Sequence, residues 1–474
     1  MSFRLLHLSS YRRRLYQFST MIPPLTLASE AQSAKRKSTE ETELPKRTFS
    51  LSRNVSESSI EYQDNLKKLP KRKAALLISY CGTGYRGSQF NAGSKTIEGD
   101  VFEALVKTGL ISEENSIDPR KVGLTRCSRT DKGVHAASNI IALKIIWGAQ
   151  PKDELVKSIN THLPSNIRLW DIVRTVNSFR KKHCDSRVYE YRLPTYVFLP
   201  PSRFTLEQLR VPPPSWSKPE DATACWIAIP RSTPEQLSEK RNYRISAETL
   251  ENLRRALAKF EGSHNFFNYT KGLVPGDRTG WRRIFKFEAS DPTLIQGTEW
   301  ISLKVHGQSF MMHQIRKMVS MAIMVVRSNT PNTLIDRTFE KAKIGIPKAP
   351  GLGLLLEEPL FRSYNRKRAE ERLEVIDFKP YKEEIDAFKE KFIYESMLQE
   401  EYTNNTFDAW INAIDVQACL TPEEFAFLNP EGVIPERATV KQDQPPMPKT
   451  WRMVLTSDQE SSEDEDEDAC EESE

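Results

Sequence analysis

The chain has 474 residues, of which 28% are charged and 38% hydrophobic, a balance typical of a globular protein with disordered flanks. This length accommodates two or three domains. No run of eighteen apolar residues occurs, so we expect no helix that spans a membrane.

Charge is distributed unevenly along the chain. The net charge is +5, but eleven acidic and no basic residues lie between Asp458 and Glu474, so the remainder carries +16. A surplus of this size suits binding to a polyanion such as nucleic acid. We interpret the acidic tail as a disordered, solubilising segment. Competition of the tail with RNA for the basic surface is the alternative.

The cysteines and histidines do not show the spacing of a metal site. The six cysteines stand at positions 81, 127, 184, 225, 419 and 470 and form no C-x-x-C pair, and the seven histidines form no H-x-x-x-H pair. This pattern argues against a zinc site and against a secreted disulfide framework. We expect reduced thiols and no structural metal.

The N-terminal region carries candidate targeting signals. No acid precedes Glu30, and the same stretch holds several serines and four arginines (Arg4, Arg12, Arg13 and Arg14), the composition of a mitochondrial transit peptide. Met21 is a candidate second start. Two basic clusters, Lys35-Arg36-Lys37 and Lys71-Arg72-Lys73, are candidate nuclear import signals. We therefore expect residence in nucleus and mitochondrion, with a disordered basic arm as the alternative.

Regular structure is predicted to begin near residue 74. The hydrophobic pattern predicts a strand at 74–80, a helix from Thr96, a strand at 139–147, a helix at 153–162 and strands at 167–176 and 187–196. Proline-rich residues 197–244 interrupt this order as an insertion or linker. Ser246 then caps a helix, followed by strands at 282–289 and 300–310 and an apolar helix at 311–327. Residues 377–415 read as helical, and little order is expected after 430.

One short string combines charged residues that are suited to catalysis or binding. Arg129-Thr130-Asp131-Lys132-Gly133 places an acid between two cations, just before a glycine that permits a sharp turn. Cations on both sides favour the ionised carboxylate, which is a poor proton carrier but a serviceable nucleophile or electrostatic anchor. A surface turn with solvated charges is the alternative.

The segment Gly82-Thr83-Gly84-Tyr85-Arg86-Gly87 follows the first strand and spells G-x-G-x-x-G. A dinucleotide site needs its helix to open inside that motif, whereas the helix signal here waits until Thr96. We therefore favour a loop whose Tyr85 and Arg86 lie against a nucleic-acid backbone.

A second candidate is Tyr189, in the string Arg187-Val188-Tyr189-Glu190-Tyr191. Alternation places its ring on the same strand face as Arg187 and Tyr191. A tyrosine can stack on a base, worth roughly 1–3 kcal/mol, and its hydroxyl can take part in proton transfer. A half-buried tyrosine at the sheet rim is the alternative.

A third candidate is Arg316, which emerges from an apolar helical face shared with Met312 and Val319. Such an arginine most often snorkels to water. The alternative is an ion pair that orients a buried carboxylate, because a guanidinium stays charged and offers paired donors.

Two further segments carry weaker signals. Residues 261–271, with His264, combine aromatics, amides and a lysine, and could also be a turn over a buried phenylalanine pair. Residues 347–356, with Leu354, could equally be a buried strand.

These segments, which follow the family's order along the chain over residues 74–361, resemble the TruA family of tRNA pseudouridine synthases. The stretches Thr96-Ile97-Glu98-Gly99-Asp100 and 348–357 are similar to its eukaryotic branch. One departure is Cys127-Ser128, which replaces the glycine-containing lead-in of bacterial members. The insertion at 197–244 and the C-terminal extension also lack bacterial counterparts.

The resemblance implies an α+β fold: two ferredoxin-like halves forming one long antiparallel sheet, with helices on one face and a basic active-site cleft at the junction. It implies isomerisation of uridine to pseudouridine in tRNA, with mRNA or snRNA as further candidate substrates and with no cofactor. Asp131 would be the nucleophile, Tyr189 would stack on the base, and Arg316 would pair with Asp131. The implied RNA contacts are Arg129, Lys132, Tyr85, Arg86, His264 and Leu354.

On this basis we expect six segments: a disordered basic region (1–72), the first half of the catalytic domain (73–200), an insertion (201–244), the second half (245–376), a helical extension (377–430) and a disordered acidic tail (431–474). Bacterial relatives pair as dimers, but the extensions here could block that surface, so a monomer is favoured. The alternative function is a non-catalytic RNA-binding protein or tRNA chaperone of the same fold. An unrelated hydrolase would need a general base or metal that the sequence does not supply.

Overall fold

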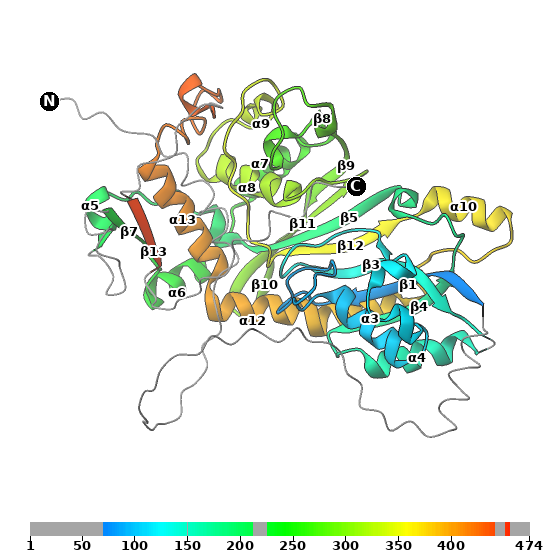
Figure 1. Ribbon diagram of the computed structural model, residues 1–474. Helices are drawn as coiled ribbons and strands as arrows, with labels where there is room; N and C mark the ends of the chain where they lie inside the picture. The colour runs from blue at the N-terminus through cyan, green and yellow to red at the C-terminus, as the bar shows by residue number, and fades with distance from the viewer. Residues whose placement is uncertain (1–69, 149, 212–224, 441–450, 456–474) are drawn as a thin grey trace, which may run out of the picture. The chain divides into compact units, whose positions relative to one another are not determined.

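The computed structural model describes residues 70–148, 150–211, 225–440 and 451–455 (Figure 1). The predicted transit peptide, Met21, Lys35-Arg36-Lys37 and the tail from Asp458 lie outside these residues. The described chain divides into two compact units. We call residues 70–187 with 355–404 the N-terminal unit, and residues 188–354 with the described part of 405–455 the central unit. None of the helices in the described ranges has the length and apolar character needed to cross a membrane.

The sheet of the N-terminal unit has the strand order β4-β1-β3-β12. Its strands are β1 (Lys71–Tyr80), β3 (His135–Ile146), β4 (Ile167–Arg174) and β12 (Leu354–Leu360), with the short β2 (Thr125–Arg126) paired to β3. β1 is antiparallel to both neighbours. β12 runs parallel to β3, through Leu355 opposite His135. The sheet is therefore mixed, although mostly antiparallel.

Helices cover both faces of this sheet. The side chains from Ala74 to Tyr80 are fully buried, on both faces of β1. α4 (Lys152–His162) lies against β4 and contacts α3 (Ile97–Lys107). The first turn of α3 is capped by the hydroxyl of Thr96, the residue at which the helix was predicted to start. α11 (Lys382–Phe388) lies against β3, where Phe388 meets Trp170 of β4 edge to face. A π-helical turn and α12 (Glu395–Asn404) continue this C-terminal layer.

The strands of the central unit that belong to the ten-stranded sheet have the order β5-β11-β9-β8. Its strands are β5 (Ser186–Pro194), β8 (Gly262–Asn265), β9 (Trp281–Ala289) and β11 (Thr298–Gly307), with β10 (Thr293–Ile295) paired to β11. α7 (Ala247–Ala258) packs on β9 and on α8 (Gln314–Arg327). Ser246 caps α7 by accepting a hydrogen bond from Thr249, as predicted. The predicted α+β class is confirmed, with ten strands shared equally between the two units.

The insertion forms its own three-stranded sheet, of order β13-β7-β6. These strands are β6 (Arg210–Val211), β7 (Cys225–Ile229) and β13 (Trp451–Leu455). α6 (Pro234–Asn242) follows, and α13 (Thr406–Leu420) packs Val416 and Leu420 against Leu209 and Ile227. The expectation of little order after 430 is wrong for residues 431–440 and for β13. A strand paired to a distant segment leaves no local sequence signal.

Three further predictions need correction. The apolar helix begins at Gln314 rather than Met311, because His313 adopts a left-handed conformation with φ of 60°. The predicted helical stretch 377–415 is broken at Asn405, where φ is 50°, and the chain there passes from the N-terminal to the central unit. Lys71-Arg72-Lys73 lies in β1, where Lys73 is buried and bonded to the carbonyls of Gly123 and Ala142. Regular structure therefore begins at Lys71 rather than near residue 74, inside the region expected to be disordered, and the role of this cluster as an import signal stays a prediction.

Candidate active site

Asp131 lies in the loop between β2 and β3. Its backbone carbonyl accepts a hydrogen bond from Val134 at 3.1 Å, and Gly133 between them has φ of 74°, which favours glycine. Asp131 and Lys132 are half-buried and Arg129 is exposed. The turn therefore presents the acid and both cations near the surface of the N-terminal unit.

A buried network holds the residues before Asp131. The Tyr80 hydroxyl lies 2.9 Å from the Thr130 hydroxyl, and the Asn139 amide donates to Tyr80 at 3.1 Å and to the Ser128 carbonyl at 3.0 Å. Burial raises the pKa of Tyr80 to about 12. The phenol therefore stays protonated, and because it accepts from Asn139 its own proton is available to Thr130.

The glycine loop braces the same turn. The Ser88 amide donates to the Thr130 carbonyl at 3.1 Å, and the Thr130 amide donates to the Ser88 hydroxyl at 2.9 Å. The Gly133 backbone amide donates to the Tyr85 carbonyl at 3.3 Å. A Cβ on Gly87 would lie 3.1 Å from the Thr130 carbonyl oxygen. The G-x-G-x-x-G segment is thus a support for the Asp131 turn.

The two RNA candidates in that loop differ in exposure. Arg86 is exposed, whereas Tyr85 is buried, donates its hydroxyl to Asp100 of α3 at 2.6 Å and has Lys95 over its ring. Burial and the Asp100 carboxylate raise the pKa of Tyr85. α3 begins ten residues after Gly87, at Ile97, which bears out the reading against a dinucleotide site. RNA contacts by both residues stay predictions.

Arg187 secures the cysteine-containing lead-in that departs from bacterial members. Its guanidinium donates to the Cys127 carbonyl at 3.3 Å, to the Ser128 hydroxyl at 3.3 Å and to the Cys184 carbonyl at 3.4 Å. Sequence reasoning missed this role, as it missed Tyr80, Ser88 and Asn139. Each of these residues lies in or beside a predicted strand or loop with no motif of its own, so only their convergence in space distinguishes them.

Tyr189, in the central unit, is buried in β5 and meets Phe310 edge to face with ring centroids 5.2 Å apart. Phe310 lies between β11 and α8, the helix of Arg316. The tyrosine is thus fixed by the segment that leads into that helix.

Arg316 is only 1% exposed, which excludes snorkelling. Its Nε donates to the Ala349 carbonyl at 2.6 Å, and the Ala349 amide donates back to the Arg316 carbonyl at 3.1 Å. A buried guanidinium is tolerated only where its charge and donors are matched. Its surroundings therefore suit the orienting role better than the snorkelling one.

The segment after Ala349 joins α8 to β5. The Tyr191 hydroxyl donates to the Pro350 carbonyl at 2.7 Å, and the Arg192 backbone amide donates to the Gly353 carbonyl at 2.9 Å. Leu354 ends this segment and is buried. Within the central unit, residues 349–353 therefore link α8, which carries Arg316, to β5, which carries Tyr189.

His264 is committed to packing in the central unit. Its Nε2 lies 2.8 Å from the Glu261 carbonyl oxygen, and its ring stacks on Phe339 at 4.3 Å. Part of the side chain stays accessible. Its contact with RNA remains a prediction, and so does the Asp131–Arg316 ion pair, whose two members belong to different units.

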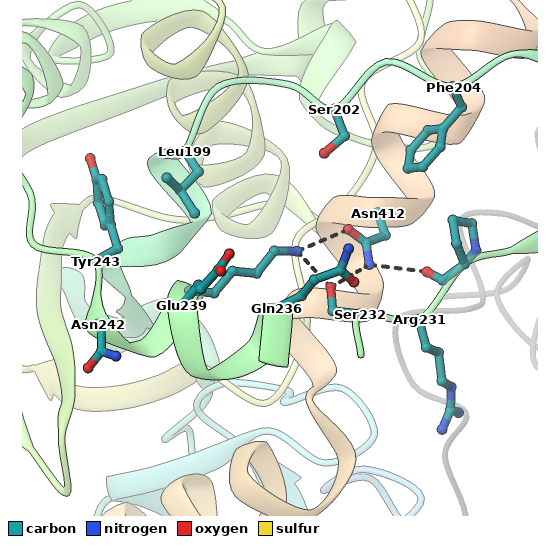
Figure 2. Close-up of a pocket in the computed structure, with 12 residues that line it drawn as sticks. Leu199, Ser202, Phe204, Arg231, Ser232, Gln236, Glu239, Asn242, Tyr243 and Asn412 are labelled. Atoms are coloured by element: carbon teal, nitrogen blue, oxygen red, sulfur yellow. Dashed lines mark hydrogen bonds between the residues drawn. The ribbon is translucent and has the colours of Figure 1, made fainter. Parts of the chain in front are cut away.

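The described residues also contain a cavity of about 580 Å³ in the central unit, but it holds none of the predicted site residues (Figure 2). It lies between the insertion and α13, lined by Ser202, Ser232, Lys240 and Asn412 among others. Lys240 donates to the Ser232 hydroxyl at 2.9 Å, and Asn412 donates to the Pro230 carbonyl at 3.1 Å. These groups are satisfied by one another, as expected of a structural joint. Among the same described residues, no cluster of three or more His, Cys, Asp or Glu could hold a metal ion.

Comparison with known proteins decides the family. A family profile described as tRNA pseudouridine synthase matches residues 256–362. tRNA pseudouridine synthase 1 of Yarrowia lipolytica is 41% identical over 420 residues, covering 78% of this chain and 79% of that protein. The chain belongs to the tRNA pseudouridine synthase family. Its activity is the isomerisation of uridine in tRNA, and the predicted family and enzyme class are confirmed.

Other relatives span most of the chain as well. The tRNA pseudouridine synthase 1 of Schizosaccharomyces pombe is 36% identical over 508 residues, covering 85% of this chain and 93% of that protein. Pseudouridylate synthase 1 homolog of Mus musculus is 37% identical over 361 residues, covering 75% of this chain and 77% of that protein. The likeness of this tRNA pseudouridine synthase family member thus extends to both fungal and mammalian proteins.

Proposed function

We propose that the protein isomerises specific uridines of tRNA with Asp131 as its catalytic carboxylate. In the reaction the C1′–N1 bond breaks, a C1′–C5 bond forms, and the proton from C5 is exchanged for one at N1, so no oxidant or reductant is consumed. Asp131 acts as nucleophile, at ribose C1′ or at the pyrimidine ring. The observation that carries this assignment is the braced turn: a surface acid follows directly on the buried Tyr80–Thr130–Asn139 network.

Tyr189 and Arg316 complete the proposed machinery. Tyr189 stacks on the flipped base and manages its proton, and Arg316 orients the Asp131 carboxylate. Support comes from the burial of Arg316 and from the edge contact that fixes Tyr189. A buried guanidinium is an apt partner for a carboxylate because its donors are planar and permanently charged.

The proposed RNA contacts begin with three cations beside the turn: Arg129, Lys132 and Arg86. Arg129 assists base flipping, which costs a few kcal/mol that stacking and phosphate contacts offset. Tyr85, His264 and Leu354 complete the proposed set. We extend the proposal to mRNA or snRNA as further substrates, to a monomer, and to nuclear and mitochondrial residence, on the sequence features given above.

Replacing Asp131 tests the assignment. Asp131→Asn should lower the single-turnover rate of pseudouridine formation in tRNA by at least about a thousandfold, since it removes the nucleophile. tRNA affinity should stay within about threefold, because phosphate contacts dominate affinity. The matched control is Asp153→Asn, an exposed aspartate at the start of α4, which should retain full activity.

Two results would count against the proposal. A variant that still modifies every wild-type position would remove Asp131 from the chemistry. A wild-type protein that binds tRNA but forms no pseudouridine in a single turnover would favour the non-catalytic RNA-binding alternative.

A further inference from the structure

Two large aromatic side chains are exposed on one strand of the central unit. Trp281 is 56% exposed and Phe285 is 42% exposed, both on β9. The other face of β9 is different: Ile284 and Phe287 are buried, and α7 packs on the strand. Exposed aromatics on a folded sheet add nothing to its core, and grouped apolar exposure marks interaction surfaces.

The exposed face of β9 is ordered by stacking. The Arg283 guanidinium lies over the Phe285 ring at 5.5 Å, and the His306 ring of β11 lies 4.8 Å from Phe285. A bulge at Phe285 produces this arrangement, because Ile284 pairs with Gly307 and Lys286 with His306, which leaves Phe285 as the extra residue. The ring is held before any ligand arrives, which reduces the ordering cost of binding.

The same face carries more positive than negative charge, with Arg283, Lys286 and Lys304 beside one acid, Glu288, which stands opposite Lys304 in the strand pairing. Arg283 and Lys304 are both exposed, and no carboxylate of the described chain forms an ion pair with either. Lys286 lies 3.7 Å from Glu261 and 3.8 Å from Glu288, so its charge is partly matched. The pattern is aromatic rings interleaved with exposed cations, which suits a nucleic-acid strand because rings stack on bases and cations contact phosphates.

We propose that Trp281, Phe285 and their flanking cations form a platform for single-stranded RNA. Unpaired bases stack on the two rings, while Arg283 and Lys304 contact phosphates. The rings are four residues apart, roughly 13 Å along a strand, so they receive separate bases. A duplex would present only its backbone here, so the platform selects unpaired segments of the substrate. The proposal rests on tRNA pseudouridylation and adds a substrate contact to it.

The test uses the full-length protein and labelled oligoadenylate, which contains no uridine to react. The double variant Trp281→Ala/Phe285→Ala should lose single-strand affinity by about tenfold or more, the loss expected for one or two stacked bases. Its affinity for the same strand annealed to oligouridylate should change less than twofold. The ring-preserving pair Trp281→Phe/Phe285→Tyr should restore most of the single-strand binding.

Two further variants separate stacking from charge and from general surface effects. Arg283→Gln should reduce the slope of log affinity against log salt by about 0.7, the value for one phosphate contact on a single strand. The matched control is Leu294→Ala, on β10 of the same sheet and 61% exposed, which should bind both RNAs as the wild type does.

Unchanged single-strand affinity in the double alanine variant would overturn the platform and leave a protein partner as the reason for the exposed rings. Equal losses for single strand and duplex, together with a lowered melting temperature, would show that the rings only support the fold. Failure of the proposed function is distinguishable from both, because it would appear as absent pseudouridine formation by the wild type while oligoadenylate binding is unaffected.

Discussion

Single hydroxyl groups hold the turn before Asp131, the proposed catalytic residue. Tyr80 is fully buried, and its phenol is the point where β1, β3 and the turn before Asp131 meet. Thr130 is the residue directly before the proposed nucleophile. Loss or movement of the Tyr80 hydroxyl therefore affects the position of Asp131 through one hydrogen bond, to Thr130, and one peptide unit.

Tyr80→Phe tests this positioning role. Loss of the hydroxyl should cost about 1–3 kcal/mol of unfolding free energy, because buried partners are left unsatisfied. It should also lower kcat for pseudouridine formation while leaving KM for tRNA nearly unchanged. The matched control is Tyr269→Phe in the central unit, which removes a fully buried phenol bonded to Thr338 at 2.7 Å. Similar losses of kcat in both variants would mean that only general stability is affected.

A buried amine gives the protein a pH-dependent stability term. Burial, with repulsion from Lys144 and Arg180, lowers the pKa of Lys73 to about 8. Below that pH the folded and unfolded chains both hold the proton. Between about pH 8 and the ordinary lysine pKa of about 10.4, Lys73 holds its proton only in the unfolded chain. The free energy of unfolding therefore rises with pH over this range, by up to about 1.4 kcal/mol per pH unit.

Comparing the pH dependence of unfolding in the wild type and in Lys73→Met isolates the contribution of Lys73 to stability. The difference in unfolding free energy, wild type minus variant, should increase by about 1.5 kcal/mol between about pH 8 and 9.5 and stay nearly constant below about pH 7. Denaturant unfolding at a series of pH values measures it. Parallel pH curves for the two proteins would contradict the lowered pKa.

At the scale of elements, the glycine loop and the Asp131 turn act as one unit. Two backbone–backbone hydrogen bonds, and a third from the Thr130 amide to the Ser88 hydroxyl, join residues 85–88 to Thr130 and Gly133. Gly87 combines a φ of 100° with a close approach to the Thr130 carbonyl. A side chain at this position is strained by its own backbone and also presses on Thr130, the residue before the proposed catalytic Asp131.

Gly87→Ala therefore predicts two separable effects. The positive φ should cost about 1–3 kcal/mol of stability, and displacement of Thr130 should lower kcat. Gly93→Ala is the control, because Gly93 has φ of 82° but no atom within 4 Å of its added Cβ. Thermal unfolding should show comparable losses in both variants, whereas single-turnover kinetics should detect a slower reaction only for Gly87→Ala. Equal rates in the two variants would mean that the loop does not position the turn.

Elements differed in how well sequence predicted them. Those with local signals were predicted well: the helix start at Thr96, the cap by Ser246 and the apolar run of β1 needed only neighbouring residues. The start of α8 was misplaced by the left-handed conformation of His313, which no propensity indicates. β13 was missed because its hydrogen bonds go to β7, more than two hundred residues earlier.

At the scale of the molecule, chain order and spatial grouping diverge. The N-terminal unit takes back residues 355–404 after the chain has built most of the central unit. Within that unit Lys389 forms a buried ion pair with Glu357 of β12, at 2.8 Å, and Thr83 bonds Ser396 at 2.9 Å. Residues 377–404 of the C-terminal extension are thus part of the unit that carries Asp131, whereas the extension from Asn405 onward belongs to the central unit.

The sequence by itself determined the family, the chemistry and the identity of the candidate acid, because a charged string beside a glycine carries its meaning in consecutive residues. It also located the buried guanidinium and the capped helices. Only the tertiary structure decided what holds the acid, through Tyr80, Ser88, Asn139 and Arg187, and which aromatic rings stay exposed on β9. The physical reason is that hydrogen bonds between distant segments and exposure on a bulged strand depend on pairing in space, which no window along the chain contains.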